Sequence, residues 1–301
     1  MNSDPPVYRI LLFYAFVQIA HPEALALEHL SFCKRLGIKG RILIAHEGIN
    51  GTLSGTLAQT EEYRRVMQQI PLFRDIVYKI DESDHHVFDK IFVRPKKELV
   101  TFRLDEDVNP HVLTGKHLKP VEFYEKLQDP NVIVIDGRND YEYDIGHFRG
   151  AIRPDVESSR DFPTWIRNNL TAYKDKTILT YCTGGIRCEK LSGFLLQEGF
   201  QDVSQLEGGI VTYGKDPEVR GRLFDGKCYV FDKRKSVKIN QTAEDCVVGQ
   251  CYHCGSLEDR YINCANDLCH LQHICCTTCE ENYNSFCTVE CEAVKMSQLE
   301  A

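Results

Sequence analysis

Apolar residues in the first hundred positions occur both in short continuous runs and in stretches with helical spacing. The continuous runs predict four strands, at residues 9–17, 41–45, 52–54 and 76–80. Apolar positions that repeat every three or four residues predict two helices, at residues 22–36 and 59–69. The order strand, helix, strand, strand, helix, strand is typical of a ferredoxin-like (acylphosphatase-like) α+β domain, which we place at residues 1–104.

Further along the chain, buried strands alternate with helices. The same criteria predict strands at residues 132–135 and 177–181, and helices at residues 121–127 and just before Gly199. This alternation indicates an α/β domain with a parallel sheet, which we place at residues 121–225. Residues 105–120 are mostly polar and contain two prolines and a glycine, so we expect a linker there.

Composition narrows the class of protein. The 301 residues are 43% hydrophobic and 27% charged, as in a globular protein, and no apolar run is long enough to cross a membrane. The first apolar run lacks the charged segment and the cleavage site of a signal peptide, so we expect a cytoplasmic protein. The net charge of −8 argues against broad, non-specific binding to nucleic acids but leaves room for a local basic groove.

The candidate active site follows the strand predicted at residues 177–181. There the chain reads Cys182, Thr183, Gly184, Gly185, Ile186 and Arg187, and a helix begins. The glycines allow the loop to curl so that backbone N–H groups bind an anion, and the helix N-terminus and Arg187 add positive charge. A thiol in such a loop ionises easily and becomes a nucleophile. The alternative is a buried structural cysteine beside an ordinary turn, and the Gly-Gly and Arg at this spacing favour the reactive thiol.

This loop resembles the active-site loop of the rhodanese superfamily, in which a cysteine carries a persulfide. The six residues from Cys182 to Arg187 match sulfur-handling rhodaneses, whereas related dual-specificity phosphatases have a loop one residue longer. Residues 136–142 and 146–151 resemble the two accessory motifs of the superfamily. Gly137 replaces a usually larger apolar residue, which predicts a looser pocket wall. We expect a structural ion-pair network among Asp136, Arg138 and Glu142.

The C-terminal residues 226–301 combine a basic connector with a cysteine-rich tail. Nine of the fourteen cysteines lie between Cys251 and Cys291, a density that indicates metal or redox chemistry in a chain without an export signal. Eight of them form four pairs that suit two tetrahedral structural zinc sites, Cys251 and Cys254, Cys264 and Cys269, Cys276 and Cys279, and Cys287 and Cys291. The spacing leaves sequential and interleaved pairing open, with Cys275 left over and His270 and His273 as alternative ligands. We see no signal for an organic cofactor.

Two short basic segments are candidate contacts for nucleic acid. Their residues are Arg94, Lys96 and Lys97 beside a possible strand, and Lys233, Arg234 and Lys235 in the connector. A protected edge strand and a solvated connector explain them equally well. The polar loop at residues 46–51 either lines a pocket or serves only as a turn.

From about residue 8 to residue 291 the chain resembles the rhodanese-like tRNA uridine hydroxylases. The resemblance is carried by the tail and by residues 47–55, 93–98, 181–190 and 207–209. It implies hydroxylation of the wobble uridine of tRNA to 5-hydroxyuridine, with tRNA as partner and molecular oxygen as co-substrate. It also implies Cys182 as the catalytic residue, assisted by Arg187, with a cysteine persulfide as the intermediate.

Two other functions fit the same residues. A simple sulfurtransferase would move sulfane sulfur through a persulfide on Cys182. A zinc-stabilised RNA-binding protein with an inert rhodanese domain would need no reactive thiol, and the intact Cys182 and Arg187 argue against it.

Overall fold

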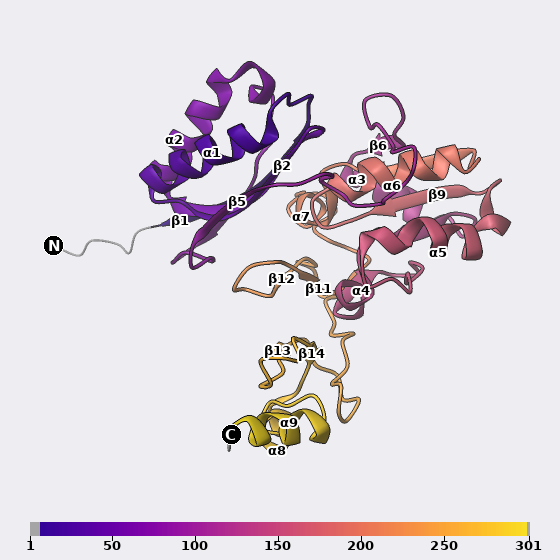
Figure 1. The fold of residues 1–301 in the computed structure, drawn as a ribbon. Coiled ribbons are helices and arrows are strands. Elements are labelled where there is room, and N and C mark those ends of the chain that lie inside the picture. Colours follow the sequence, from indigo (N-terminus) through magenta and orange to yellow (C-terminus); the bar gives the residue numbers. More distant parts are fainter. Residues whose placement is uncertain (1–6, 300–301) are drawn as a thin grey trace.

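The computed structural model describes residues 7–299, and the elements form three regions (Figure 1). The N-terminal region is a sheet with two helices on one face, and the central region is a second sheet flanked by helices. The C-terminal region is a small unit of short strands and two helices, set apart from both sheets in the view of Figure 1. Within the described residues, we find no helix with the length and apolar character of a membrane span.

The N-terminal region has the expected order of strands and helices plus one further strand. Its elements are β1 (Tyr8–Phe16), α1 (Pro22–Leu36), β2 (Lys39–Ala45), β3 (Gly48–Thr56), α2 (Leu57–Gln69), β4 (Lys79–Ser83) and β5 (Ile91–Pro95). The sheet order is β4-β1-β3-β2-β5, and β5 is parallel to β2. Pro22 opens α1 and Gly37 ends it in the left-handed conformation, while Thr56 and Gln59 form a capping box on α2.

Two boundaries in this region differ from the sequence pattern. The loop predicted at residues 46–51 is mostly strand, because β3 begins at Gly48 and pairs with both β1 and β2. Pairing on both edges outweighs the turn preference of Asn50-Gly51. The strand predicted at residues 76–80 begins only at Lys79. The ferredoxin-like order itself is confirmed.

The central region is built on a parallel sheet of order β6-β10-β9-β7. Its elements are β6 (Lys116–Leu118), α3 (Pro120–Leu127), β7 (Ile133–Asp136), α4 (Asp140–Asp144), β8 (Gly146–Phe148), α5 (Phe162–Asn169), β9 (Thr177–Tyr181), α6 (Ile186–Gln197), β10 (Asp202–Leu206) and α7 (Gly209–Tyr213). The buried side chains of this region form two apolar clusters, one with Ile178 and one with Leu179. Consecutive side chains of a strand point to opposite faces, so both faces of the sheet are covered.

Residues 105–120, where we expected a linker, are packed against the central region. β6 lies within this stretch and pairs with β10, and Val108 is buried in the same apolar cluster as Phe194 of α6. The polar composition is misleading because a short edge strand and a surface loop bury only a few side chains.

The C-terminal region begins as an extension of the central one. β11 (Phe224–Tyr229) pairs with β8 and with β12 (Ser236–Lys238). The tail then adds β13 (Tyr261–Asn263), β14 (Gln272–Ile274), α8 (Thr277–Asn282) and α9 (Val289–Leu299). Two of its buried clusters consist largely of cysteines, so apolar packing gives those parts of the tail little stability, while Tyr261 and Ile274 pack against Ile145 and Tyr229.

Candidate functional site

The thiol of Cys182 lies at the carboxyl end of β9, inside the loop that leads into α6. Its side chain is buried, with 1% exposed, and its sulfur accepts a hydrogen bond from the Gly185 backbone N–H at 3.1 Å. Gly185 has a φ of +103°, a conformation that side-chain-bearing residues rarely adopt, so glycine is needed for the curl. The anion-binding loop expected from the sequence is therefore present around this sulfur.

The surroundings of Cys182 favour its thiolate form. Burial opposes ionisation of this thiol. A hydrogen bond from the Cys188 thiol, the positive charge of Arg187 and the backbone N–H groups of Cys188 and Gly185 outweigh that effect. Together they hold the pKa of Cys182 well below the usual value for a thiol. A lowered pKa of this kind is what a nucleophilic thiol requires.

Cys188 has the opposite character. It is fully buried in the first turn of α6, and burial followed by its hydrogen bond to Cys182 raises its pKa well above the usual value. Gly137 lies beside it: a Cβ on Gly137 would come within 2.9 Å of both a Leu191 methyl group and the Tyr181 carbonyl oxygen. The expectation of a looser wall at Gly137 is therefore wrong, because α6 and β9 pack directly against it.

The accessory motifs hold the loop through two separate ion pairs. Arg187 binds both carboxylate oxygens of Glu142, at 2.5 and 2.9 Å, and donates to the Thr183 hydroxyl at 3.2 Å. Arg138 pairs with Asp136 at 2.6 Å, and both side chains are fully buried. The expected single network is thus two pairs, and Glu142 belongs to the one that fixes Arg187 beside Cys182.

α7 supports the loop from the other side. Ile210 and Val211 donate backbone hydrogen bonds to the carbonyls of Cys182 and Thr183, at 3.0 and 3.1 Å. Gly209 has a φ of +71°, and a Cβ there would lie 2.5 Å from the Cys182 carbonyl oxygen. Only glycine permits this close approach, which explains structurally why the sequence has a glycine at the end of residues 207–209.

The N-terminal region contacts the loop through residues that the sequence did not indicate. Leu12 lies against Gly184, and the Tyr14 hydroxyl lies against Gly185 and donates to Glu189 at 2.8 Å. The ammonium group of Lys79 sits over the Tyr14 ring, 4.6 Å from its centroid. Burial lowers the pKa of Lys79 to about 8, although Cys182 and Glu189 act against this. These side chains line one cavity of about 500 Å³ together with Cys182 and Arg187.

A buried lysine joins the two regions beside this cavity. Lys190 of α6 is fully buried, and its ammonium lies 2.8 Å from Glu47, 2.6 Å from Asp107 and 3.8 Å from Glu98. Glu47 belongs to the turn before β3, and the other two carboxylates belong to the stretch between the sheets. Removing one partner of such a buried group costs about 3–5 kcal/mol, so Lys190 helps to hold the N-terminal and central regions together.

The two basic segments have different surroundings. Arg94, Lys96 and Lys97 are exposed, and they form no ion pair within residues 7–299. Lys233 pairs with Asp89, and Arg234 pairs with Asp232 and Asp81 at 2.7 and 3.1 Å. Lys96 and Arg234 both line the cavity that contains Cys182.

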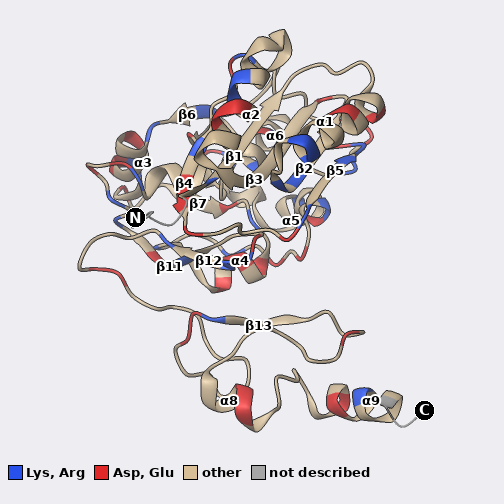
Figure 2. Cartoon of the chain, turned by 90° about the vertical axis from the view of Figure 1, so that its left-hand side faces the viewer, with Lys and Arg blue, Asp and Glu red and all other residues tan. Residues whose placement is uncertain are grey.

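Two pockets lie over β2 and β5, the part of the chain where Figure 2 shows several Lys and Arg positions in blue. Arg41, which the sequence did not single out, and Phe92 line both pockets. One pocket adds Arg94 and Lys96, and the other adds Phe231, Lys233 and Lys235 together with the carboxylates of Asp89 and Asp232. Phe231 is 49% exposed. Basic groups beside exposed rings suit a single-stranded nucleic acid, because they bind phosphates and stack on bases.

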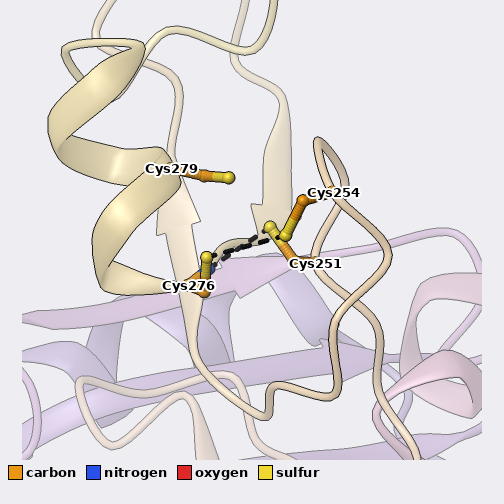
Figure 3. A group of neighbouring side chains, drawn as sticks. All are labelled: Cys251, Cys254, Cys276 and Cys279. Atoms are coloured by element: carbon orange, nitrogen blue, oxygen red, sulfur yellow. Dashed lines mark hydrogen bonds between the residues drawn. The ribbon is translucent and has the colours of Figure 1, made fainter.

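The eight paired cysteines form two groups of four with interleaved pairing. Cys251 and Cys254 meet Cys276 and Cys279, and Cys264 and Cys269 meet Cys287 and Cys291, each group with its sulfurs within 4.8 Å of one another. Figure 3 shows the first group converging from a loop and from the start of α8. Three sulfur–sulfur separations within these groups are 3.4–3.8 Å, close to the ~3.8 Å between ligands of a tetrahedral ion with Zn–S bonds of about 2.3 Å. Both groups can therefore hold a metal ion.

Three family models match successive stretches of the chain. Residues 8–99 match the UPF0176 acylphosphatase-like domain, residues 119–216 the rhodanese-like domain and residues 225–292 the rhodanese C-terminal region. Among solved structures, a rhodanese-like domain from Anabaena sp. is 22% identical, with a TM-score of 0.31, and covers 38% of this chain and 80% of that chain. The family model that matches residues 119–216 identifies the part of the chain with the parallel sheet and the Cys182 loop as a rhodanese-like domain.

Curated relatives identify the family. The chain is 58% identical to a tRNA uridine(34) hydroxylase of Bacillus velezensis and 59% identical to one of Bacillus licheniformis. Each match covers 94% of this chain and 88% of the relative. The chain belongs to the tRNA uridine(34) hydroxylase family.

Proposed function

We propose that this protein hydroxylates C5 of the wobble uridine of tRNA with molecular oxygen, and that Cys182 is its catalytic residue. The observation that carries the proposal is the activated thiol of Cys182 in a cavity beside a basic and aromatic surface, within a chain 58% identical to a tRNA uridine(34) hydroxylase. The reaction inserts one oxygen atom of O2 into the C5–H bond. The second oxygen atom leaves as water after a reductant supplies two electrons and two protons.

The loop residues have separate roles in this proposal. Cys182 carries the reactive sulfur, as a persulfide when sulfane sulfur has been loaded. Thr183, Gly184, Gly185 and Ile186 supply the backbone frame, and Arg187 stabilises negative charge on the sulfur while Glu142 holds its guanidinium. Lys79 lies in the same cavity and has a pKa near 8, which suits the transfer of a proton to or from the base.

The tRNA would approach over β2 and β5. The anticodon loop is single-stranded, so its bases can stack on Phe92 and Phe231 while its phosphates meet Arg41, Arg94, Lys96 and Lys97. Lys233, Arg234 and Lys235 would add to this surface, although Arg234 is already paired with two carboxylates. The wobble base would then enter the cavity between Tyr14 and Cys182.

The two cysteine groups are proposed to hold one structural zinc ion each. Four thiolates close a tetrahedral site and leave no position for a substrate, which argues for a structural role. Metal binding would supply the stability that apolar packing in the tail does not.

The test of function is mass spectrometry of tRNA digested after incubation with the purified chain and a thiol reductant under ¹⁸O2. We expect 5-hydroxyuridine that carries one ¹⁸O atom, and no product from Cys182→Ser. Cys246→Ser is the matched control, because Cys246 is exposed and outside both cysteine groups. Product that lacks ¹⁸O would contradict the use of molecular oxygen.

A sulfurtransferase is the second candidate, favoured by the short loop around a thiol with a low pKa. It would transfer sulfane sulfur from thiosulfate to a thiol acceptor through Cys182 without tRNA. Sulfur transfer at a high rate, together with no modified uridine in any tRNA, would replace the hydroxylase proposal.

The proposed tRNA surface predicts a change in the salt dependence of binding. Arg94→Ala, Lys96→Ala and Lys97→Ala combined should reduce the slope of log K against log salt by about 2–3, since each lost phosphate contact removes about 0.7–0.9. The matched control neutralises Lys34, Arg35 and Lys176, which are exposed elsewhere. If the slope of log K against log salt were equal in both triple variants, β5 would not be part of the tRNA interface.

A further inference from the structure

A third group of metal-ligand side chains lies in the tail, next to the first cysteine group. It consists of His253, His273 and Cys275, whose donor atoms lie within 4.8 Å of one another. His253 belongs to the loop between Cys251 and Cys254, while His273 lies in β14 and Cys275 directly follows that strand. The eight paired cysteines complete two groups of four, so Cys275 is not needed in either group.

The imidazoles of this group lack hydrogen-bond partners. Both ring nitrogens of His273 and Nε2 of His253 are buried, and no other atom of the described residues pairs with them. His273 is only 4% exposed. Leaving a buried polar group unpaired costs about 1–3 kcal/mol, so buried histidines normally have a partner.

Packing holds the two rings in place. Tyr283 stacks on His253 with ring centroids 4.0 Å apart, and Tyr252 contacts His273 at 5.4 Å. The two imidazoles lie 5.5 Å apart and nearly perpendicular, at 85°. Aromatic side chains thus fix two unpaired nitrogen donors close to a thiol, the kind of arrangement that preorganises a ligand set.

We propose that His253, His273 and Cys275 form a third metal site, which binds a divalent transition metal ion of the zinc class. Two imidazoles and one thiolate suit zinc or cobalt, whereas calcium and magnesium require oxygen ligands. Cys275 binds as the thiolate, so its proton passes to solvent when the metal enters. Three protein ligands leave a fourth position for water or a small molecule, unlike the closed groups of four cysteines.

A cavity adjoins this site. It has a volume of about 460 Å³ and is lined by His273 together with Tyr252 and Gln272. Of the three proposed ligands, only His273 lines this cavity, and both of its ring nitrogens are buried. The site is independent of the proposed hydroxylation, because none of its residues lines the cavity of Cys182.

The test compares the metal content of full-length variants by elemental analysis and native mass spectrometry after equilibration with zinc. We expect three equivalents in the unaltered chain and two in His273→Ala. His270→Asn is the control and should keep three, because His270 is exposed and outside the group. Equal metal content in the unaltered chain and in His273→Ala would overturn the proposal.

Cobalt provides a second readout that does not depend on counting zinc. Cobalt is added to the chain after two zinc ions have filled the two groups of four cysteines. It should then produce a charge-transfer band from one thiolate ligand. In Cys275→Ser this band should be absent, although both groups of four still hold zinc. No band in the unaltered chain would also overturn the site. If His273→Ala does not fold, Cys275→Ser and His253→Gln provide the comparison. If the unaltered chain held one equivalent of zinc and His273→Ala held none, the result would contradict zinc in the cysteine groups and would still support the third site.

Discussion

The chain uses cysteine in two regions for opposite purposes. Cys182 is a single thiol at the end of β9, and its low pKa comes from Cys188, Arg187 and backbone N–H groups that the parallel sheet places around it. In the tail, eight thiols form two groups whose buried clusters are themselves mostly cysteines, while Tyr261 and Ile274 pack on Ile145 and Tyr229. In the central region the fold lowers the pKa of one thiol, whereas in the tail the thiols gather into two groups that can hold metal ions.

This difference shows that burial alone does not indicate what a cysteine does. Cys182 and Cys188 are both buried and lie within one loop and helix turn, yet their pKa values move in opposite directions. Burial raises the pKa of both thiols, and the balance of hydrogen bonds and charges decides the outcome. A tail thiol bound to zinc would be a thiolate that does not react freely.

The largest effect should follow removal of metal from the tail. Structural zinc in small domains contributes roughly 10–16 kcal/mol of apparent binding free energy per site, which is folding free energy. A strong chelator, or Cys276→Ser, should therefore unfold residues 251–291 while the central sheet persists. Limited proteolysis followed by mass spectrometry would locate the cuts.

Cys246→Ser is the control for that experiment, because Cys246 belongs to neither group of four cysteines. Cuts spread evenly over all three regions would contradict the comparison, since they would mean that the tail metal supports the whole chain.

The next largest effect should be a loss of activity with no change in stability. Cys182→Ser should reduce formation of 5-hydroxyuridine by at least about a thousandfold, because an oxygen nucleophile can neither ionise at neutral pH nor carry sulfane sulfur. Its melting temperature and metal content should match those of the unaltered chain. Activity within tenfold of normal would show that Cys182 is structural after all, like its neighbour.

The smallest effect concerns the contribution of Cys188 to the pKa of Cys182. Cys188→Ala removes a hydrogen bond to a thiolate, which is worth about 1.5–3 kcal/mol, so the pKa of Cys182 should rise by about 1–2 units. The sign follows from stabilisation of the charged form: when the donor is lost, less thiolate exists at a given pH. The rate of alkylation of Cys182 against pH measures the shift.

Cys188→Ser provides the matched comparison, since its hydroxyl can still donate to the Cys182 sulfur. Its pH profile should lie near that of the unaltered chain, and much of the activity should remain. Equal shifts in both variants would show that packing, and not the hydrogen bond, controls the thiol.

Local patterns determined the elements and the chemistry of single segments. The runs of apolar residues predicted the ferredoxin-like order and the parallel sheet, because burial on one or both faces leaves a periodic trace in the sequence. The loop from Cys182 to Arg187 was predictable because its strand, glycines and helix start are contiguous. The density of tail cysteines was enough to indicate metal-binding groups.

Only the tertiary structure decided which distant residues meet. Tyr14 and Lys79 reach the cavity of Cys182 from more than one hundred positions away, and Glu142 lies opposite Arg187 in place of the expected Arg138. The cysteine pairs interleave because β14 and α8 bring the third pair back to the first. No local period records such contacts, since they depend on how regions pack against one another and not on which face of one element is apolar.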